Sequence, residues 1–582
     1  MCYTEDEKIQ GRGVLYQMTS RLLKKEYHTQ LCVVGGGLAG LATAVSAARH
    51  GTRVILIHDR PVLGGNASSE IRMWVGGAKG KDNREGGLVE EWMLENYFFN
   101  PNAKFTLWDT VLYDSAIREK NLTLLLNTSV MDADCDGDRI VSVTAWQSNA
   151  ETFHKVYADY YADCSGDSIL APLSGAEFRY GREAKAEFNE SIPPEVADRK
   201  TMGMSCLFQI RETDHKVTFT PPDWAYDYPT EEDLCHRTHD LKDNFWWIEV
   251  GGLKDCIHDT DDCREELIKI AFGVWDHIKN HGDHGTDNWE LEWIGYLPGK
   301  RESRRYVGEY LVNQNDVEAE GRFEDLVAYA GWSMDDHFPE GFYYKDGCST
   351  IWHPAPRPWG LPLRAMISKN IQNLVFAGRN ISVTHAALSS SRVMATCGIL
   401  GQALGTAVSQ ALAEGVDIRK VDISRLQQTL MADDCYLPWH ERKVSLLSQK
   451  AKCNAEMIRN GRDRGEENLW IGKEGDYLEY TFEEPTKVSS LRIVFDSNLN
   501  RKIYNMPCRF LLKTPYLEVP KTLIASFDIE IVDEKGEKTV TTYENHQRFV
   551  RIPVGKKVQS VRLIPLSTWG SEEYRVFSFE VI

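Results

Sequence analysis

The most regular hydrophobic pattern in the chain begins at residue 31, where the apolar residues 31–34 form a strand-length run. The glycine-rich stretch Gly35-Gly-Gly37-Leu-Ala-Gly40 follows directly, then small residues over 41–48 that predict a helix, and a second strand-like run over 53–57. This strand–helix–strand order around G-x-G-x-x-G is typical of a dinucleotide-binding fold. The sequence therefore predicts a Rossmann-like α/β domain whose glycine loop holds a pyrophosphate at the helix N-terminus.

The residues of this loop have separate roles in such a site. The first glycine allows a tight turn, the second lets the backbone approach the phosphates, and the third lets the helix pack on the strand. A carboxylate that binds the ribose is expected about 20 residues later, but the second strand ends in His58-Asp59-Arg60. Either His58 or Asp59 binds the ribose, and the sequence leaves both open. The contacts expected here are Gly35, Gly37, Leu38, Ala39, Gly40, His58, Asp59 and Arg60.

Further segments of the chain also combine strand-like runs with glycines at which a ligand could approach the backbone. Paired glycines occur within 61–70, an apolar run over 121–130 predicts a strand ahead of a turn at 136–138, and 161–167 ends in Ser-Gly-Asp. A later strand, over 373–378, ends in a glycine, and 390–407 predicts a long Ala/Gly-rich helix. Paired glycines suit a backbone that must approach a ligand closely, and a helix N-terminus stabilises negative charge.

The region from about residue 30 to about residue 410 resembles the FAD-dependent oxidoreductase family, through V-L-G-G-N-A-S-S-E at 62–70 and A-G-R-N-I-S-V-T-H-A-A-L at 377–388. The resemblance implies FAD, bound by a Rossmann domain of the glutathione-reductase type, with the helix at 390–407 directed at the flavin pyrimidine edge. The further cofactor contacts that it implies are Gly64, Gly65, Asn66, Ala67, Val130, Ser165, Gly166, Asp167, Gly378, Arg379, Asn380 and Arg392.

Residues 171–360 carry no cofactor motif and are expected to form an α+β substrate cap, inserted between the two parts of the FAD-binding domain, 30–170 and 361–412. Aromatic residues are dense there, and rings with polar edges suit sugar faces, although most such side chains pack in cores. Trp352 and Arg304 are the substrate-binding candidates. Arg301 and Arg305 are expected to form ion pairs that fasten the cap.

Oxidation of an alcohol needs a base that takes the hydroxyl proton as the hydride leaves carbon. His385 is the first candidate because it follows the Gly378 turn, and His353 is the second. Imidazole titrates near neutrality and can accept such a proton. Arg392, at the start of the long helix, is expected to contact substrate or the flavin edge.

The pattern changes after a helical connector at 413–453, since 454–582 reads as alternating strands separated by polar turns. This predicts an all-β sandwich. Ile458-Arg-Asn-Gly461, Trp470 and a strand at 558–563 resemble the discoidin or galactose-binding jelly roll. The resemblance implies sugar binding, while packing on the core or a dimer contact is the alternative.

Composition narrows the partners and the compartment. A net charge of −19 over 582 residues argues against nucleic acid and anionic membranes, and no apolar run approaches the ~18 residues of a membrane span. The 13 cysteines form no C-x-x-C pair, and the extension at 1–29 shows no secretory signal, so a cytoplasmic protein with reduced thiols is expected. Cys256 and Cys263 match no zinc template, and no metal site is expected.

These patterns together predict an FAD-dependent oxidoreductase that oxidises a hydroxyl of a carbohydrate or glycoside by hydride transfer to flavin N5. An external electron acceptor and possible homo-oligomers complete the expectation. Two alternatives stay open. One is a reductase of an unsaturated carboxylate that uses Arg301, Arg304, Arg305 and Arg392, and the other is a glycan-binding protein with structural FAD.

Overall fold

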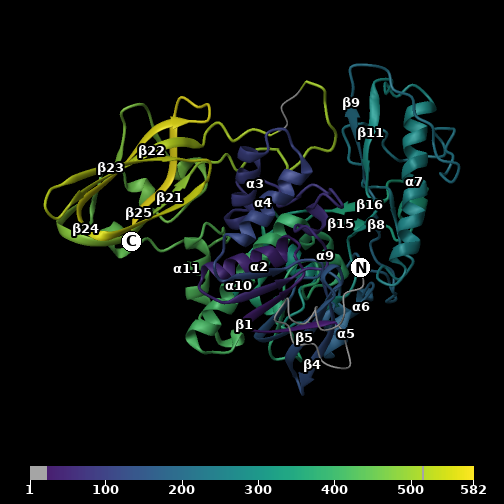
Figure 1. The fold of residues 1–582 in the computed structure, drawn as a ribbon, viewed down its shortest axis with the longest axis horizontal. Coiled ribbons are helices and arrows are strands. Elements are labelled where there is room, and N and C mark those ends of the chain that lie inside the picture. The colour runs from purple at the N-terminus through teal and green to yellow at the C-terminus, as the bar shows by residue number, and fades with distance from the viewer. Residues whose placement is uncertain (1–21, 514–516) are drawn as a thin grey trace, which may run out of the picture.

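A computed structural model describes residues 22–513 and 517–582. Three parts lie side by side in Figure 1: an α/β core in the centre, a cap around the long helix α7 (Thr260–Asn280) on one side, and an all-β region on the other. Residues 1–21, most of the expected N-terminal extension, lie outside the described residues. The first strand, β1 (Leu23–Val34), already begins within that extension.

One sheet with β1 near its centre organises the core. β1 pairs in parallel with β2 (Val54–Ile57) on one side and β6 (Thr152–Asp163) on the other. β3 (Leu122–Leu125) extends the sheet beyond β2, and β18 (Leu374–Phe376) pairs with β6. The long apolar runs of the sequence thus become the buried parallel strands whose carboxyl ends form the site.

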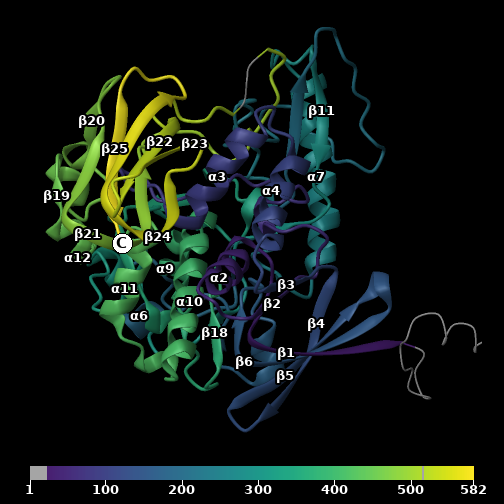
Figure 2. The same ribbon diagram turned by 60° about the vertical axis from the view of Figure 1, so that its left-hand side comes forward.

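The segment predicted as one strand over 121–130 is two strands. β3 ends at Leu125, Asn127 adopts a left-handed φ of 53°, and β4 (Thr128–Asp136) then turns back through β5 (Arg139–Gln147). This antiparallel pair reaches away from the helices in Figure 2. The left-handed residue breaks the strand, because it redirects the chain out of the first sheet register.

The helices α2 (Leu38–Arg49) and α10 (Met394–Glu414) pack directly on each other. A Cβ on Gly401 would lie 2.0 Å from the carbonyl oxygen of Ala39, so glycine lets the backbones meet. The helix predicted over 390–407 begins only at Met394, because Arg392 and Val393 separate it from the shorter α9 (His385–Ser391). The other helices of the core are α3 (Gly87–Phe99), α4 (Phe105–Ile117), α5 (Leu170–Ser174), α6 (Lys185–Phe188) and α8 (Gln314–Glu318).

The cap has a hydrophobic core of its own, in which Trp275 and other buried residues of α7 pack with Phe208 and Trp247. Its strands are β8 (Met204–Ser205), β9 (Phe208–Glu212), β10 (Glu249–Val250), β11 (Trp289–Ile294) and β12 (Gly299–Lys300). The later part of the segment expected as cap packs in the main core instead, where β14 (Leu326–Ala330) pairs with β17 (Trp359–Pro362). Between them, the hairpin of β15 (Met334–His337) and β16 (Thr350–His353) lies against the cap.

The C-terminal region is all-β, as its alternating pattern predicts. Its strands form one sheet in the order β20-β25-β21-β24-β22-β23, with β19 paired to β21. The connector before it contains α11 (Ile423–Ala432) and α12 (Leu446–Lys450). The strands are β19 (Lys452–Cys453), β20 (Trp470–Gly472), β21 (Leu478–Phe495), β22 (Ile524–Asp533), β23 (Lys538–Glu544), β24 (Phe549–Thr568) and β25 (Tyr574–Val581).

The chain between β21 and β22 reaches from the all-β region to the other two parts. The side-chain oxygen of Asn505 accepts a hydrogen bond from the N–H of Val75 at 2.8 Å, and Tyr504 stacks on Trp74 with ring centroids 5.2 Å apart. Farther along, the N–H of Phe510 donates to Ile210 of β9 at 2.9 Å. The C-terminal region therefore supports the wall between core and cap.

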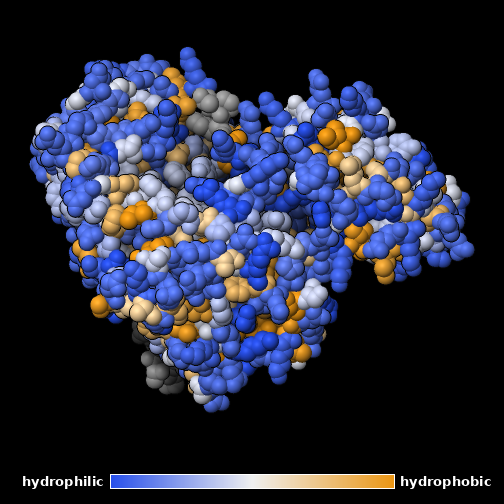
Figure 3. Space-filling model, turned by 180° about the vertical axis from the view of Figure 1, so that it is seen from behind, coloured by the Kyte–Doolittle hydropathy of each residue, from blue (hydrophilic) through white to orange (hydrophobic). Residues whose placement is uncertain are grey.

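The surface of the described residues shows two general features. Within the described ranges, no helix combines the length and apolar character needed to cross a membrane. On the face shown in Figure 3, hydrophobic residues are scattered among hydrophilic ones in small patches. Small scattered apolar groups of this kind are ordinary on a protein surface.

Candidate active site

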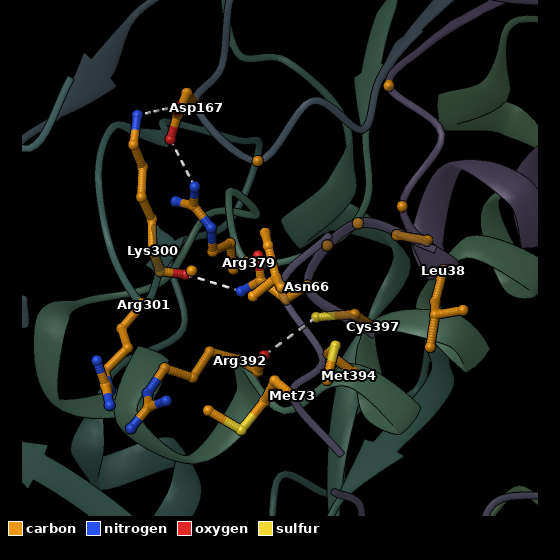
Figure 4. A pocket seen from close by; sticks show the side chains of 18 of the residues that line it. Leu38, Asn66, Met73, Asp167, Lys300, Arg301, Arg379, Arg392, Met394 and Cys397 are labelled. Carbon is orange, nitrogen blue, oxygen red and sulfur yellow. Dashed lines mark hydrogen bonds and ion pairs between the residues drawn. The ribbon is translucent and has the colours of Figure 1, made fainter. Parts of the chain in front are cut away.

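A cavity of about 770 Å³ is lined by residues from both ends of the core. It runs from the carboxyl ends of β1, β2 and β6, past the N-terminus of α2, to the N-terminus of α10 and the cap. Figure 4 shows side chains from these elements pointing into one space. In open α/β sheets, ligands bind outside the carboxyl ends of the strands, so this cavity is the candidate active site.

The glycine loop after β1 is shaped by contacts that only glycine allows. A Cβ on Gly40 would lie 1.8 Å from the carbonyl oxygen of Gly35. Gly37, the N-cap of α2, makes no side-chain cap and has open space at its Cβ position, with Gly65 Cα 3.9 Å away. The first N–H groups of α2 thus lie at the cavity without a side-chain cap, which is how helix N-termini bind pyrophosphate.

His58 and Asp59, the two alternatives for the ribose, differ in their surroundings. His58 is buried, with the N–H of Gly36 donating to its Nδ1 at 2.9 Å and its Nε2 3.0 Å from the carbonyl oxygen of Val62. Both residues line the cavity, but only the side chain of Asp59 is exposed, at 62%, with its Oδ1 3.2 Å from Nδ1 of His58. His58 holds the glycine loop in place, and the geometry favours Asp59 as the ribose ligand.

Asp167 joins the core to the cap at the cavity wall. Its carboxylate lies 2.7 Å from Nζ of Lys300 and also binds Arg379, which follows β18. Burial alone would raise the pKa of Asp167, but the charges of Arg379 and Lys300 outweigh it and hold the pKa well below its usual range. The ion pairs are visible in Figure 4, where the carbonyl oxygen of Lys300 also accepts from Asn66 Nδ2 at 3.1 Å.

Most of the expected cofactor residues meet at this cavity. Gly40, Ala67 and Asn380 lie behind the lining instead, since Ala67 accepts from Trp108 Nε1 at 2.9 Å and Asn380 Nδ2 donates to Asp163 at 3.2 Å. Those that line it are Gly35, Gly37, Leu38, Ala39, His58, Asp59, Arg60, Gly64, Gly65, Asn66, Val130, Ser165, Gly166, Asp167, Gly378, Arg379 and Arg392. An exposed carboxylate, an uncapped helix N-terminus and a second helix N-terminus along one cavity fit the ribose, pyrophosphate and flavin of FAD.

Tryptophans and charged groups make the other end of the cavity. Arg392, between α9 and α10, lies 3.2 Å from Oδ2 of Asp335, and Figure 4 shows its guanidinium beside that of Arg301. The Nδ1 of His337 lies 2.6 Å from Oε2 of Glu249, and its Nε2 lies 3.4 Å from Oδ2 of Asp335. The tryptophans that line this end are Trp74, Trp246, Trp332 and Trp352.

The β15–β16 hairpin decides which side chains reach the cavity. Asp335 pairs with Trp352 and His337 with Thr350, and directly opposite residues share a face of the sheet. Asp335, His337 and Trp352 therefore point to the cavity side. His353 pairs with Met334 and falls on the opposite face, and it does not line the cavity.

His385, the first candidate for the base, lies behind the cavity wall. Its Nδ1 is 2.9 Å from Oε2 of Glu302, and its Nε2 is 2.9 Å from Oδ1 of Asp336. Burial would lower the pKa of His385, but these two carboxylates outweigh it and raise the pKa to about 10. Protonated and paired on both sides, His385 offers no lone pair to a substrate.

The arginines expected to fasten the cap do pair with carboxylates. Arg305 is buried against Glu183, 3.1 Å away, and Arg301 lies 3.5 Å from Glu249. Arg304 lines the cavity and donates to the carbonyl oxygen of Asp167 at 3.2 Å.

Sequence reasoning missed Lys79, Glu249, Asp335 and His337. Residues 334–337, Met-Asp-Asp-His, hold two of these at alternate positions, a pattern that one half-exposed strand would produce. Only the hairpin register shows which face is toward the ligand.

A family model described as FAD dependent oxidoreductase matches residues 30–430, more than half of the chain. The chain belongs to the FAD-dependent oxidoreductase family. It is accordingly an FAD-dependent enzyme, and the cavity described above contains the residues that fit this cofactor.

Solved structures and curated sequences add no narrower identity. A geranylgeranyl bacteriochlorophyll reductase-like protein from Thermoplasma acidophilum is 11% identical over 71% of this chain and 85% of its own, with a TM-score of 0.33. The p-nitrophenol 4-monooxygenase PnpA from Pseudomonas putida DLL-E4 is 10% identical over 68% and 83%, with a TM-score of 0.31. A family 32 carbohydrate-binding module from Streptococcus pneumoniae EndoD is 14% identical over 24% of this chain and 99% of the module, with a TM-score of 0.19. No curated protein matches the chain.

Proposed function

We propose that this flavoenzyme oxidises a hydroxyl group of a carbohydrate or glycoside, with His337 as the base that takes the hydroxyl proton. The observation that carries the proposal is the position of His337 among Asp335, Arg392 and four tryptophans at the substrate end of the cavity. FAD, when bound, accepts a hydride at N5 from the carbon that bears the hydroxyl. An external acceptor then removes the electrons.

Glu249 prepares His337 for this role. The 2.6 Å contact between His337 Nδ1 and Glu249 Oε2 suits an N–H donor at Nδ1. Nε2 takes the hydroxyl proton in this proposal, because its contact with Asp335 Oδ2, at 3.4 Å, is longer than the 2.9 Å contacts on both nitrogens of His385, and Arg392 binds the same Oδ2 at 3.2 Å. A buried carboxylate behind the imidazole also stabilises the imidazolium that forms when the proton is taken. Burial would raise the pKa of Glu249, but Arg301 and His337 outweigh it and lower the pKa, so the carboxylate is ionised.

The tryptophans supply the sugar contacts in this proposal. Trp352 is 52% exposed although it lines the cavity, and Trp246 meets it edge to face at 6.3 Å between ring centroids. Indole faces suit the C–H faces of a sugar ring, and nearby charged groups bind its hydroxyls. The all-β region, if it is a discoidin-like module, would bind the rest of a larger glycan.

A reductase of an unsaturated carboxylate is the second candidate, favoured by the cations at this end. Lys79 lies 4.0 Å from the ring centroid of Trp332 at the cavity, beside Arg301 and Arg392. Two carboxylates, Glu249 and Asp335, offset two of these three charges, so one positive charge is in surplus for a substrate carboxylate. Arg304 would assist from the cap in this case.

Anaerobic titration of the flavin separates the candidates. Glycosides, free sugars and dicarboxylates are added in turn, and the visible flavin absorbance is followed. Bleaching by a sugar supports the oxidase proposal, and the His337→Gln variant should then bind FAD but bleach far more slowly. Reoxidation of chemically reduced enzyme by an unsaturated acid alone, lost in Arg304→Ala, would establish the reductase. A flavin that neither class of compound changes would leave the third function, a glycan-binding protein with structural FAD.

A further inference from the structure

Three histidines and one glutamate form a cluster in the cap. Glu231 and His239 come from the loop ahead of α7, His277 from the last turn of α7, and His284 from the turn that follows. One ligand atom from each lies within 4.8 Å of the others. The three imidazole centroids are 4.8 to 5.2 Å apart. Imidazole nitrogens with one carboxylate are a ligand set that zinc uses in proteins.

The nitrogens that meet in this cluster lack hydrogen-bond partners. Nε2 of His239, His277 and His284 is buried in each case without a hydrogen bond among the described residues. The nearest charged group to Nε2 of His277 and His284 is Oε1 of Glu231, at 3.4 and 3.3 Å. His277 is only 1% exposed. A buried polar atom left unpaired costs free energy, and native proteins rarely retain such atoms together. A bound cation would satisfy all three at once.

His277 is held in the tautomer that a metal needs. Its Nδ1 lies 2.6 Å from the carbonyl oxygen of Tyr228, so Nδ1 carries the proton and donates it to that carbonyl. The lone pair is then on Nε2, which points at the cluster and lies 3.4 Å from Oε1 of Glu231. Metal-binding histidines commonly use a backbone carbonyl on the far nitrogen in this way.

The turn after α7 is built to bring His284 back to His277. Gly282 adopts a φ of +86°, and a Cβ there would lie 3.2 Å from Nε2 of His284 and 3.6 Å from Oε1 of Glu231. Lys279 closes the same turn by donating to the carbonyl oxygens of Thr286 and Trp289, the latter at 2.8 Å. The cation of Lys279 is therefore engaged on backbone groups and leaves the cluster to its four ligands.

We propose that Glu231, His239, His277 and His284 bind one Zn²⁺ ion, or a similar divalent transition metal, as a structural site. Four protein ligands fill a tetrahedral coordination sphere and leave no position for a substrate. The site is an addition to what the sequence predicts, since its ligands come from two segments at spacings that match no zinc template.

The position of the site separates it from the redox chemistry. Thr260, at the start of α7, lines the FAD cavity, and His277 is seventeen residues farther along the helix. At 1.5 Å of rise per residue, this places the cluster roughly 25 Å away along the axis. Figure 1 shows α7 spanning the cap between these ends.

A metal here would fix the loop from Glu231 to His239 against α7. That loop contains Arg237, whose guanidinium binds the carbonyl oxygens of Gly341, Phe342 and Tyr344 between β15 and β16. The proposed ion thus stabilises the cap next to the hairpin that carries His337.

The histidine at the C-cap of α7 provides the matched control. His281, one turn after His277, lies 3.3 Å from Asp276 Oδ2, which satisfies its Nε2. Its ring is 33% exposed, and it lies in a separate group with Asp227 and Asp276, not among the four proposed ligands. Removing it should leave the proposed ion in place.

Metal analysis of the full-length flavoprotein tests the proposal. Each protein is stripped with EDTA, incubated with zinc sulfate, passed through gel filtration and measured by plasma mass spectrometry, with bound flavin as a check of folding. We expect about one zinc per chain in the wild type and in His281→Ala. We expect at least a tenfold loss in His277→Ala and His284→Ala.

Several results would overturn the site. Wild-type protein that holds no zinc, a His284→Ala variant that holds as much as wild type, or an equal loss in His281→Ala each contradicts it. If His277→Ala fails to fold, His284→Ala in the turn and Glu231→Gln still decide the question. The EPR spectrum of cobalt-loaded wild type gives a separate test, since a tetrahedral spectrum supports the proposal and an octahedral one contradicts it.

Discussion

The two ends of the FAD cavity are built in different ways. The cofactor end consists mainly of backbone from short contiguous segments, such as the loop from Gly35 to Gly40 and the N-terminus of α2. The substrate end consists of side chains from separate elements: His337 on β15, Trp352 on β16 and Arg392 between two helices. The first end needs a particular local conformation, and the second needs those elements to meet in one register.

The cofactor end can be alike in many enzymes, whereas the substrate end must differ between enzymes that act on different substrates. A dinucleotide presents the same phosphates to every enzyme that binds it, so glycines and helix N-termini serve all of them. A substrate differs from enzyme to enzyme, and its contacts are placed on elements whose side chains can vary without disturbing the fold.

The largest effect on FAD binding should come from substitutions of glycines at the cofactor end. One of these glycines is needed for folding and another for access of the cofactor. Gly40→Ala places a Cβ 1.8 Å from the carbonyl oxygen of Gly35, so it should disrupt α2 and abolish both folding and FAD binding. The added Cβ in Gly37→Ala meets nothing closer than 3.9 Å, and the φ of −65° is permitted, so the protein should fold. The same methyl group occupies open space at the N-terminus of α2, where the pyrophosphate is expected, so FAD binding should be lost. Circular dichroism and the flavin-to-protein absorbance ratio measure the two effects. A Gly37→Ala protein with full FAD would show that the pyrophosphate lies elsewhere.

His337→Gln should abolish most activity at the substrate end without touching the cofactor end. Loss of a general base typically lowers kcat by about 10² to 10⁴-fold, while bound flavin should stay unchanged. The rate of flavin reduction by the best sugar substrate, followed by stopped-flow absorbance, measures this loss. His353→Gln, on the other face of the hairpin, is the matched control, and equal loss in both variants would remove His337 from the proposed role.

His385 should matter for stability rather than for catalysis. Its pKa in the folded protein is raised to about 10, from about 6.5 when unfolded. The stabilisation is therefore fully present below about pH 6.5 and declines as pH rises toward 10. Replacing it by Gln removes the positive charge that Glu302 and Asp336 share, although Arg305 still lies 3.4 Å from Glu302. Breaking such a buried pair costs on the order of 3 kcal/mol. Urea unfolding at several pH values measures this. If the free energy of unfolding of the wild type does not change across that pH range, the ion pairs of His385 with Glu302 and Asp336 are not stabilising.

The smallest effect should come from the loop that the C-terminal region sends to the wall. Asn505→Ala removes the contact to Val75, next to Trp74 at the cavity, and one such hydrogen bond is worth about 1 kcal/mol. KM should rise several-fold with kcat nearly unchanged. The exposed Lys502 in the same loop gives the control, Lys502→Ala. A fall in kcat alone would assign Asn505 to chemistry and not to positioning.

The sequence predicted the core of the fold because each element there is coded locally. The apolar run at 31–34, the small residues of α2 and the strand before Gly378 all occur as expected. Predictions failed where a single residue redirects the chain, as at Asn127, or where a helix is interrupted, as at Arg392 and Val393. The candidate base lies behind the cavity wall because Glu302 and Asp336, on two other segments, decide the environment of His385.

By itself, the sequence determined the α/β core, the glycine loops and the cofactor, because these depend on local conformation and on residues adjacent in the chain. Only the tertiary structure decided that Asp59 is exposed at the cavity while the His58 ring holds the glycine loop, and that His337 faces the cavity while His385 and His353 do not. It also decided that Glu231 and three histidines of the cap meet at the end of α7. Strand register and helix packing fix which face of an element a side chain occupies, and those are set by contacts between segments far apart in the chain.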